Sequence, residues 1–234
     1  MKPNTTEARQ LVTKLLSIPG GSTREKEVMD FLVERLTQSG ADPAWIRFDR
    51  ANQRSPFGGQ CGNLILKVPG RRRGPRRLLM AHVDTVPLCQ GAQPVEHNGY
   101  LVPADPQTAL GADDRSGTAA ILYAALRVLR ERPQHPPLTF LWTVQEEIGL
   151  RGATTAAYAL APRSGLAVDV DFAIDTPGLA KTRYGDAAMG KGPTVTKGAN
   201  INPVVLDLLL RAAEVDGIPY QLTAEPRGTG TDAN

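Results

Sequence analysis

Acidic residues and one histidine gather in four short clusters, each next to a predicted strand or helix. The clusters are His82 with Asp84, Asp113 with Asp114, Glu146 with Glu147, and Asp169 with the later Asp175. In open α/β sheets, ligands bind at the carboxyl ends of strands. Carboxylates converging there repel one another unless cations neutralise them, and carboxylates with a neutral imidazole suit zinc or manganese. Together the clusters predict a dinuclear metal site.

Each cluster alone also has a simpler explanation. A histidine at a strand end is commonly a satisfied polar residue. Asp113 and Asp114 could cap the helix that follows them, and Glu146 and Glu147 could be a charged first helical turn. The metal hypothesis depends on the four clusters occurring together.

A two-metal site predicts hydrolytic chemistry. Two ions roughly 3.5–4 Å apart clamp the attacking and leaving oxygens, and they lower the pKa of a bound water to about 7. A nearby carboxylate that binds no metal can act as base and then as acid. Because Glu146 and Glu147 are adjacent, one can be free while the other is a ligand. Hydrolysis of an amide or peptide is the expected reaction.

Strands and helices that would position these clusters follow from the apolar periodicity. Helices are expected from residue 8 to Pro19-Gly20, and then to Gly40 after a capping box of Ser22 and Glu25. Further helices are predicted at 116–132, 150–160 and 203–215, strands at 63–68, 77–83, 138–144, 166–174 and 220–224, and a hairpin at 96–103. Alternating strands and helices predict a layered α/β sandwich with a mostly parallel sheet.

Composition is that of a globular protein. The 234 residues are 41% hydrophobic and 22% charged, which suits one sizeable domain. The net charge of +3 owes much to the arginine-rich run 71–77, which lacks interleaved aromatics, so we expect a solvated turn and no nucleic-acid partner. Two cysteines, no apolar leader and no membrane-length apolar run predict a cytoplasmic protein with free thiols and no membrane partner.

A glycine-rich stretch at 185–198 is predicted to be a loop. Its first residues, Gly185 to Lys191, fit the start of a phosphate-binding P-loop. However, Gly192 stands where that motif needs a hydroxyl for magnesium, so an NTPase is not favoured.

At these clusters the sequence resembles the co-catalytic zinc exopeptidase superfamily. The motifs MAHVDTVP, LGADDRSG and QEEIGLRGA resemble tripeptidase T and related carboxypeptidase-type enzymes, whereas AVDVDFAIDTPG, GKGPT, GIPYQ and GTDA resemble glutamyl and tetrahedral aminopeptidases. The resemblance implies the three-layer zinc-exopeptidase (phosphorylase/hydrolase-like) fold with a mixed, mostly parallel sheet. It also implies two divalent metal ions, zinc first, with cobalt or manganese as alternatives.

Residue roles follow from the same resemblance. It implies that His82, Asp113, Glu147 and Asp169 are metal ligands, with Asp113 bridging the ions and Asp175 the alternative to Asp169. Asp84 would orient His82, since metal-bound histidines donate their other N–H to such a partner. Glu146 would be the general acid/base.

Two departures from the family pattern matter. The final histidine ligand that follows a GTDA-like segment is absent before Asn234, and neither 82–113 nor 175–234 holds a lid or dimerisation domain. We therefore expect a single catalytic domain over 1–234 that lacks its last C-terminal elements. A degenerate relative with an incomplete site is the alternative.

Peptide bonds are the expected substrate, in an aminopeptidase or small-peptide exopeptidase. An amidohydrolase that removes acyl groups from amino acids would use the same residues, because substrate choice lies in the pocket rather than in the metal shell. A non-catalytic relative is the third hypothesis. The sequence makes no prediction of oligomeric state.

Overall fold

The computed structural model describes residues 3–233, which fold into two compact units that divide between Val170 and Asp171. All of the predicted site residues except Asp175 belong to the first unit. The single catalytic domain expected over residues 1–234 stays a prediction.

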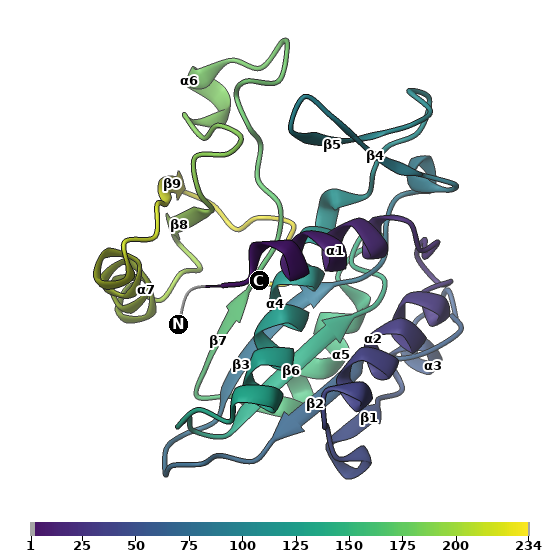
Figure 1. Ribbon diagram of the computed structural model, residues 1–234, viewed down its shortest axis with the longest axis vertical. Coiled ribbons are helices and arrows are strands. Elements are labelled where there is room, and N and C mark those ends of the chain that lie inside the picture. The colour runs from purple at the N-terminus through teal and green to yellow at the C-terminus, as the bar shows by residue number, and fades with distance from the viewer. Residues whose placement is uncertain (1–2, 234) are drawn as a thin grey trace. The chain divides into compact units, whose positions relative to one another are not determined.

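A five-stranded sheet forms the centre of the first unit (Figure 1). Its strands, in spatial order, are β1 (Ile46–Phe48), β2 (Leu64–Val68), β6 (Leu138–Thr143), β3 (Arg77–His82) and β7 (Ser164–Ala167). Strands β6, β3 and β7 are parallel, whereas β1, β2 and β6 pair antiparallel. The sheet is thus mixed, with parallel and antiparallel pairings in equal number. The three parallel strands end at one edge.

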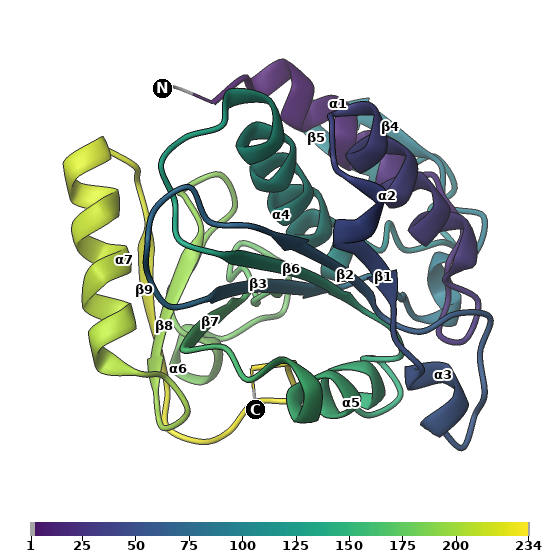
Figure 2. The ribbon, with the colours of Figure 1, turned by 90° about the horizontal axis from the view of Figure 1, so that it is seen from below.

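Helices cover both faces of this sheet, which confirms the predicted three layers. Figure 2 shows one group of helices on one face of the sheet and a second group on the other. The first group is α1 (Thr5–Leu16), α2 (Lys26–Gln38) and α4 (Ala112–Glu131), and the second is α3 (Ala51–Arg54) and α5 (Arg151–Leu160).

The core follows the two-residue period of the strands. In β6, Phe140 and Trp142 join the cluster beneath α1, α2 and α4, whereas Leu141 joins the α5 cluster. The Phe140 and Trp142 rings stack with centroids 6.3 Å apart. Burying each such large apolar side chain contributes about 1.5–3 kcal/mol, so the strands that carry the site are firmly fixed.

Smaller elements complete the first unit. They are the predicted hairpin, β4 (Pro94–His97) and β5 (Tyr100–Pro103), and the 3-10 turns Pro43–Trp45 and Pro87–Cys89. The arginine-rich connection between β2 and β3 exposes Arg71, Arg72 and Arg73, as expected of a solvated turn.

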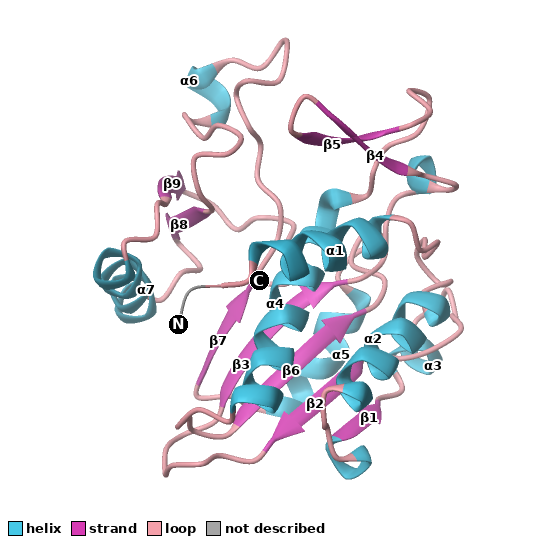
Figure 3. Ribbon diagram, viewed as in Figure 1, coloured by secondary structure: helices cyan, strands magenta, loops and turns pink. Residues whose placement is uncertain are grey.

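The second unit contains a parallel β-α-β arrangement (Figure 3). Its elements are α6 (Lys181–Tyr184), β8 (Thr194–Gly198), α7 (Pro203–Asp216) and β9 (Gln221–Glu225). Asn202 caps α7 by accepting from the N–H groups of Val204 and Val205, Pro203 opens the helix, and Gly217 ends it in a left-handed conformation. No helix within residues 3–233 is long and apolar enough to cross a membrane.

Three local predictions were wrong. Strand β8 lies inside the predicted 185–198 loop, and β7 ends at Ala167 rather than at residue 174. The capping box does not form either, because the Ser22 hydroxyl donates to Asp84 and Glu25 accepts from the Thr23 N–H. The pairing of β8 with β9 and the hydrogen bond from Ser22 to Asp84 join residues far apart in the sequence, which a local pattern does not reveal.

Candidate metal centre

The clusters predicted from the sequence meet where the three parallel strands end. His82 closes β3, Glu146 and Glu147 follow β6, Asp169 follows β7, and Asp113 and Asp114 begin α4. The strand ends therefore gather side chains from four separate segments at one edge of the sheet.

His82 is the centre of the cluster and is only 1% exposed. Its Nδ1 lies 3.0 Å from the carbonyl oxygen of Asp84, which can only accept, so Nδ1 carries a proton and Nε2 faces the acids. Nε2 lies 3.0 Å from Asp113 Oδ1 and 3.7 Å from Asp169 Oδ1. Glu146 Oε2 is 3.9 Å away. Burial lowers the pKa of His82, but hydrogen bonds to the surrounding aspartates outweigh burial and raise it.

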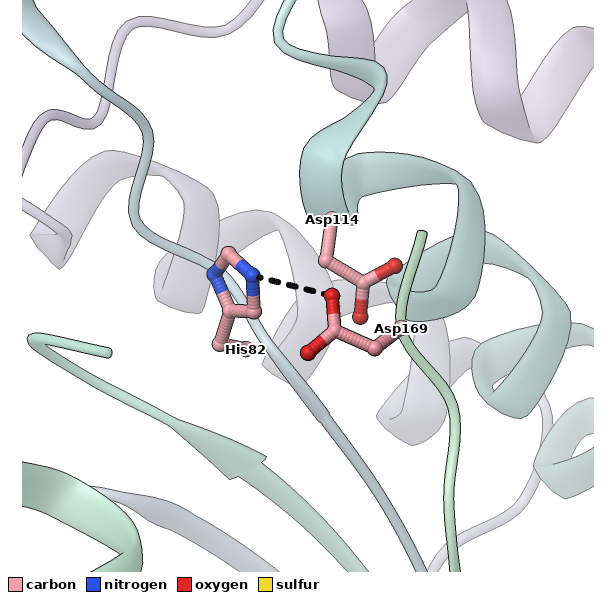
Figure 4. Close-up of side chains that lie close together, drawn as sticks. All are labelled: His82, Asp114 and Asp169. Carbon is pink, nitrogen blue, oxygen red and sulfur yellow. Dashed lines mark ion pairs between the residues drawn. The ribbon is translucent and has the colours of Figure 1, made fainter. Parts of the chain in front are cut away.

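Asp114, which belongs to one of the four predicted clusters but was assigned no ligand role of its own, is fully buried beside this imidazole. One ligand atom from each of His82, Asp114 and Asp169 lies within 4.8 Å of the others (Figure 4). Burial, assisted by the negative charges of Asp169 and Asp113, raises the pKa of Asp114 to about 9. Its Oδ2 has no hydrogen-bond partner in the described part of the chain.

The backbone at the start of α4 explains how Asp114 reaches this position. Asp113 and Asp114 are non-helical and joined by a cis peptide bond, and Asp114 Oδ1 accepts from the Gly117 N–H at 2.9 Å. A Cβ on Gly117 would lie 2.3 Å from that oxygen, so only glycine fits there. Asp114 thus caps the helix with one oxygen and turns the other toward the cluster. The capping explanation and the metal hypothesis both apply to it.

Asp84 has a different environment, although it is also fully buried. Its carboxylate accepts from the Ser22 hydroxyl at 2.6 Å and from the N–H groups of Glu146 and Glu147 at 2.9 and 3.2 Å. Burial raises the pKa of Asp84, but hydrogen bonds from His82 and Ser22 outweigh it, and the pKa is lowered. Asp84 therefore orients His82 through its carbonyl and fixes the glutamate turn through its carboxylate.

The two glutamates differ in what their surroundings do to them. Burial, followed by the charge of Asp113, raises the pKa of Glu147. Glu146 is 10% exposed and points its carboxylate toward the imidazole. Asp175, the alternative ligand, lies in the second unit, where both of its oxygens accept from the Met189 N–H at 3.2 Å.

A divalent cation fits this donor set. Around one imidazole stand several carboxyl groups whose charges oppose one another, and one buried oxygen of Asp114 is unsatisfied. Such a surplus of buried acid is unfavourable without positive charge, and oxygen with imidazole nitrogen suits zinc or manganese. The sequence placed Asp114 in a cluster but assigned the ligand role to Asp113, and it did not indicate that Ser22 contacts Asp84.

The fold and the gathered acids define the class of protein, a member of the zinc exopeptidase superfamily. The family model for M42 glutamyl aminopeptidases matches residues 104–234, and the chain belongs to that family.

Individual relatives agree with this assignment. A lysyl aminopeptidase of Pyrococcus furiosus is 40% identical over 114 residues, covering 48% of this chain and 32% of that protein. A tripeptidase structure from Staphylococcus aureus is 26% identical with a TM-score of 0.65, covering 74% of this chain and 45% of the other. The chain therefore spans less than half the length of either relative.

Similarity of fold covers more of the chain than similarity of sequence does. A TET aminopeptidase from a marine sediment archaeon of the Thaumarchaeota covers 98% of this chain and 84% of its own, with a TM-score of 0.72 at 20% identity. This similarity concerns the fold alone.

Proposed function

We propose that this protein is a metal-dependent exopeptidase that removes residues from the ends of peptides, as an aminopeptidase or small-peptide exopeptidase. The observation that carries the proposal is the convergence of His82, Asp114 and Asp169 on one point, beside Glu146. Membership of the M42 family supports the same reaction. Action in the cytoplasm, with two free cysteines, remains part of the proposal.

Two divalent ions would be held by His82, Asp113, Glu147 and Asp169, with Asp113 between them. Zinc is the metal we propose, with cobalt and manganese as the alternatives. Asp114 joins this set as a further candidate, because its unpartnered Oδ2 faces the same space as the His82 Nε2. When bound, the ions supply a Lewis acid for the scissile carbonyl and a water activated near neutral pH.

The chain's own residues would do the rest of the chemistry. Glu146 accepts a proton from the attacking water and delivers it to the leaving amine. It can do so because its carboxylate faces the cluster while its backbone N–H is anchored on Asp84. Asp84 holds His82 in the tautomer whose Nε2 lone pair is directed at the metal position.

Substrate assays test this proposal against its alternatives. Zinc-supplemented protein should hydrolyse aminoacyl-nitroanilides and short peptides with free N-termini faster than N-acyl amino acids. Turnover of N-acyl amino acids alone would support the amidohydrolase instead. A preparation that binds less than one metal ion per chain and turns over neither substrate would support the non-catalytic relative.

A further inference from the structure

A cavity of about 880 Å³ opens beside the turn that carries the two glutamates, and every residue that lines it belongs to the first unit. Its size lies within the range of small-molecule sites, which is about 300–1,000 Å³. Glu147 and Ile148 line the cavity from the turn after β6, and Thr85 lines it from the segment after β3. The cavity therefore adjoins the candidate metal centre and can hold the part of a substrate next to the reacting bond.

Most of the surface inside this cavity is apolar, and Leu16, Val86 and Leu110 contribute to it. The charged side chains that line it are three cations and three acids, Arg24, Lys26, Arg115, Glu27, Asp30 and Glu147. Lys26 and Asp30 pair with each other at 2.6 Å. Because charges of both signs occur in equal number, the cavity favours an uncharged, apolar occupant.

Phe57 supplies an aromatic ring to the cavity and is 57% exposed. The Arg151 guanidinium lies 5.8 Å from the centroid of this ring, a distance at which a cation and an aromatic face attract each other. An aromatic ring offers a large apolar contact area at the cost of ordering few bonds. Phe57 is therefore a suitable contact for an apolar group of a substrate.

The loop 55–60, which carries Phe57, is held by side-chain hydrogen bonds. It follows α3, which lies beside α5 (Figure 2). The Ser55 hydroxyl donates to Gln145 Oε1 at 2.5 Å, and Gln145 Nε2 donates to the Gly58 carbonyl at 2.6 Å. The ring of Phe57 is thus presented by a loop that is already ordered before a substrate binds, which lowers the entropic cost of binding.

Gln145 connects this loop to the turn that carries the glutamates. It is fully buried, directly precedes Glu146, and has φ 58°, in the left-handed region that disfavours residues other than glycine. Surrounding structure must hold such a conformation in place. A Cβ on Gly59 would lie 2.7 Å from Gln145 Nε2, so the loop packs closely on this side chain. One residue therefore fixes both the loop with Phe57 and the start of the turn with Glu146 and Glu147.

We propose that this cavity receives the side chain of the terminal residue that the enzyme removes, that Phe57 selects large apolar side chains there, and that Gln145 is a positioning residue for the loop that carries Phe57. The proposal rests on the proposed function, since it assigns a substrate class to the same site. Because Glu147 lines the same cavity, a side chain held against Phe57 leaves the adjoining peptide bond near the metal centre.

Kinetics on aminoacyl-nitroanilides test the specificity. The unsubstituted protein should prefer the leucyl to the alanyl substrate. Phe57→Ala should lower kcat/KM roughly tenfold for the leucyl substrate and by less than about twofold for the alanyl substrate. Phe57→Leu keeps an apolar contact and should recover part of the loss. Tyr158→Ala, which removes an exposed ring on α5 outside the cavity, is the matched control and should change neither value. Equal losses for both substrates, or no loss for either, would overturn the proposal.

Hydrogen–deuterium exchange tests the positioning of the loop. Ser55→Ala removes the hydroxyl that donates to Gln145 and that also accepts from the Phe57 N–H at 3.2 Å. Amides of residues 57–60 should then exchange roughly tenfold faster, while those of β6 keep their protection, and the preference for the leucyl substrate should narrow. Unchanged exchange at 57–60, or equal acceleration throughout the chain, would contradict the role given to Gln145.

Binding of free amino acids separates this proposal from the proposed function. In a ligand-observed NMR titration of the zinc-supplemented protein, L-leucine should bind roughly tenfold more tightly than L-alanine, and Phe57→Ala should remove most of the difference. If the unsubstituted protein hydrolyses no nitroanilide, the proposed function fails, while this titration still decides what the cavity selects. Equal binding of the two amino acids, or no binding of L-leucine, would overturn the selectivity proposed for Phe57.

Discussion

Asp84 and Asp114 are both fully buried aspartates beside the same histidine, yet their surroundings have opposite effects. Asp84, just after β3, accepts three hydrogen bonds, and its pKa is lowered. Asp114, at the start of α4, keeps one oxygen unpartnered, and its pKa is raised to about 9. Hydrogen-bond donors therefore distinguish a carboxylate that holds the site together from one that needs a cation.

The largest effect on activity is expected at Glu146, whose backbone N–H bonds to Asp84 and whose carboxylate lies near His82. Glu146→Gln should lower kcat by about 10²–10⁴, because the amide cannot take a proton from water. Its N–H stays on Asp84, so metal content measured by atomic emission should hardly change. Glu147→Gln is the paired variant and should lose metal. The reverse pattern would mean that the two glutamates exchange roles.

Removing the charge of Asp84 should destabilise the turn that carries Glu146 and Glu147. In Asp84→Asn the amide N–H₂ faces donors from Ser22 or the glutamate turn, and a buried charge interaction is lost. We expect the free energy of unfolding to fall by about 3–5 kcal/mol even without metal, measured by urea denaturation. A loss that appears only when zinc is present would assign Asp84 to the cation instead.

The pKa of Glu25 lies between those of Asp84 and Asp114, and the effect of Glu25 on stability should depend on pH. Burial raises its pKa to about 7 from an ordinary 4.5, with Asp84, Cys61 and Arg115 as the charged or titratable neighbours. Below pH 4.5 both folded and unfolded chains hold the proton. As pH rises toward 7 only the unfolded chain releases it, so stability falls.

Urea denaturation from pH 4.5 to 8 checks this dependence. Relative to Glu25→Gln, the unsubstituted protein should lose about 3 kcal/mol between pH 4.5 and 7 and nothing further above that. A stability difference that does not vary with pH would show that Glu25 ionises normally.

The smallest loss is expected at Asp114 in the metal-free protein. At neutral pH Asp114→Asn should raise the metal-free melting temperature, because the raised pKa of the buried carboxyl opposes folding there and the amide oxygen can still accept from the Gly117 N–H. It should remove much of the gain from zinc, which is about 2.7 kcal/mol at one hundred times Kd. Asp113→Asn is the matched variant, and whichever substitution abolishes the zinc-dependent shift identifies the bridging aspartate.

The local sequence pattern was enough to predict that the acidic clusters lie at the ends of strands, whereas the roles of their residues stay predictions. Strand ends and short motifs located His82, Asp84, Glu146 and Asp169, because apolar runs define where parallel strands stop. Asp114 was placed in a cluster without a ligand role of its own, and one of its oxygens does cap the helix, as the simpler explanation allowed. Ser22 and Glu25 fitted a capping box, but the Ser22 hydroxyl donates to Asp84, which only the fold brings near, and Glu25 accepts from the Thr23 N–H.

The same reasoning explains the fold-level differences. Strand β8 contains lysine and glycine and little apolar alternation, so its assignment depends on pairing with β9 across α7. In β2 and β6, successive apolar residues pack into the hydrophobic clusters on opposite faces of the sheet. Such continuous apolar runs are readily predicted as strands.

Trp142 is a natural fluorescent probe at the contact between β6 and α4. It is one of two tryptophans, is fully buried in β6, and directs its indole N–H to the Thr118 carbonyl of α4 at 3.5 Å. The Thr118 hydroxyl in turn donates to the carbonyl of His82. The strand leading to the glutamates and the helix bearing the aspartates thus share one fluorophore, whose emission can follow metal loading in real time.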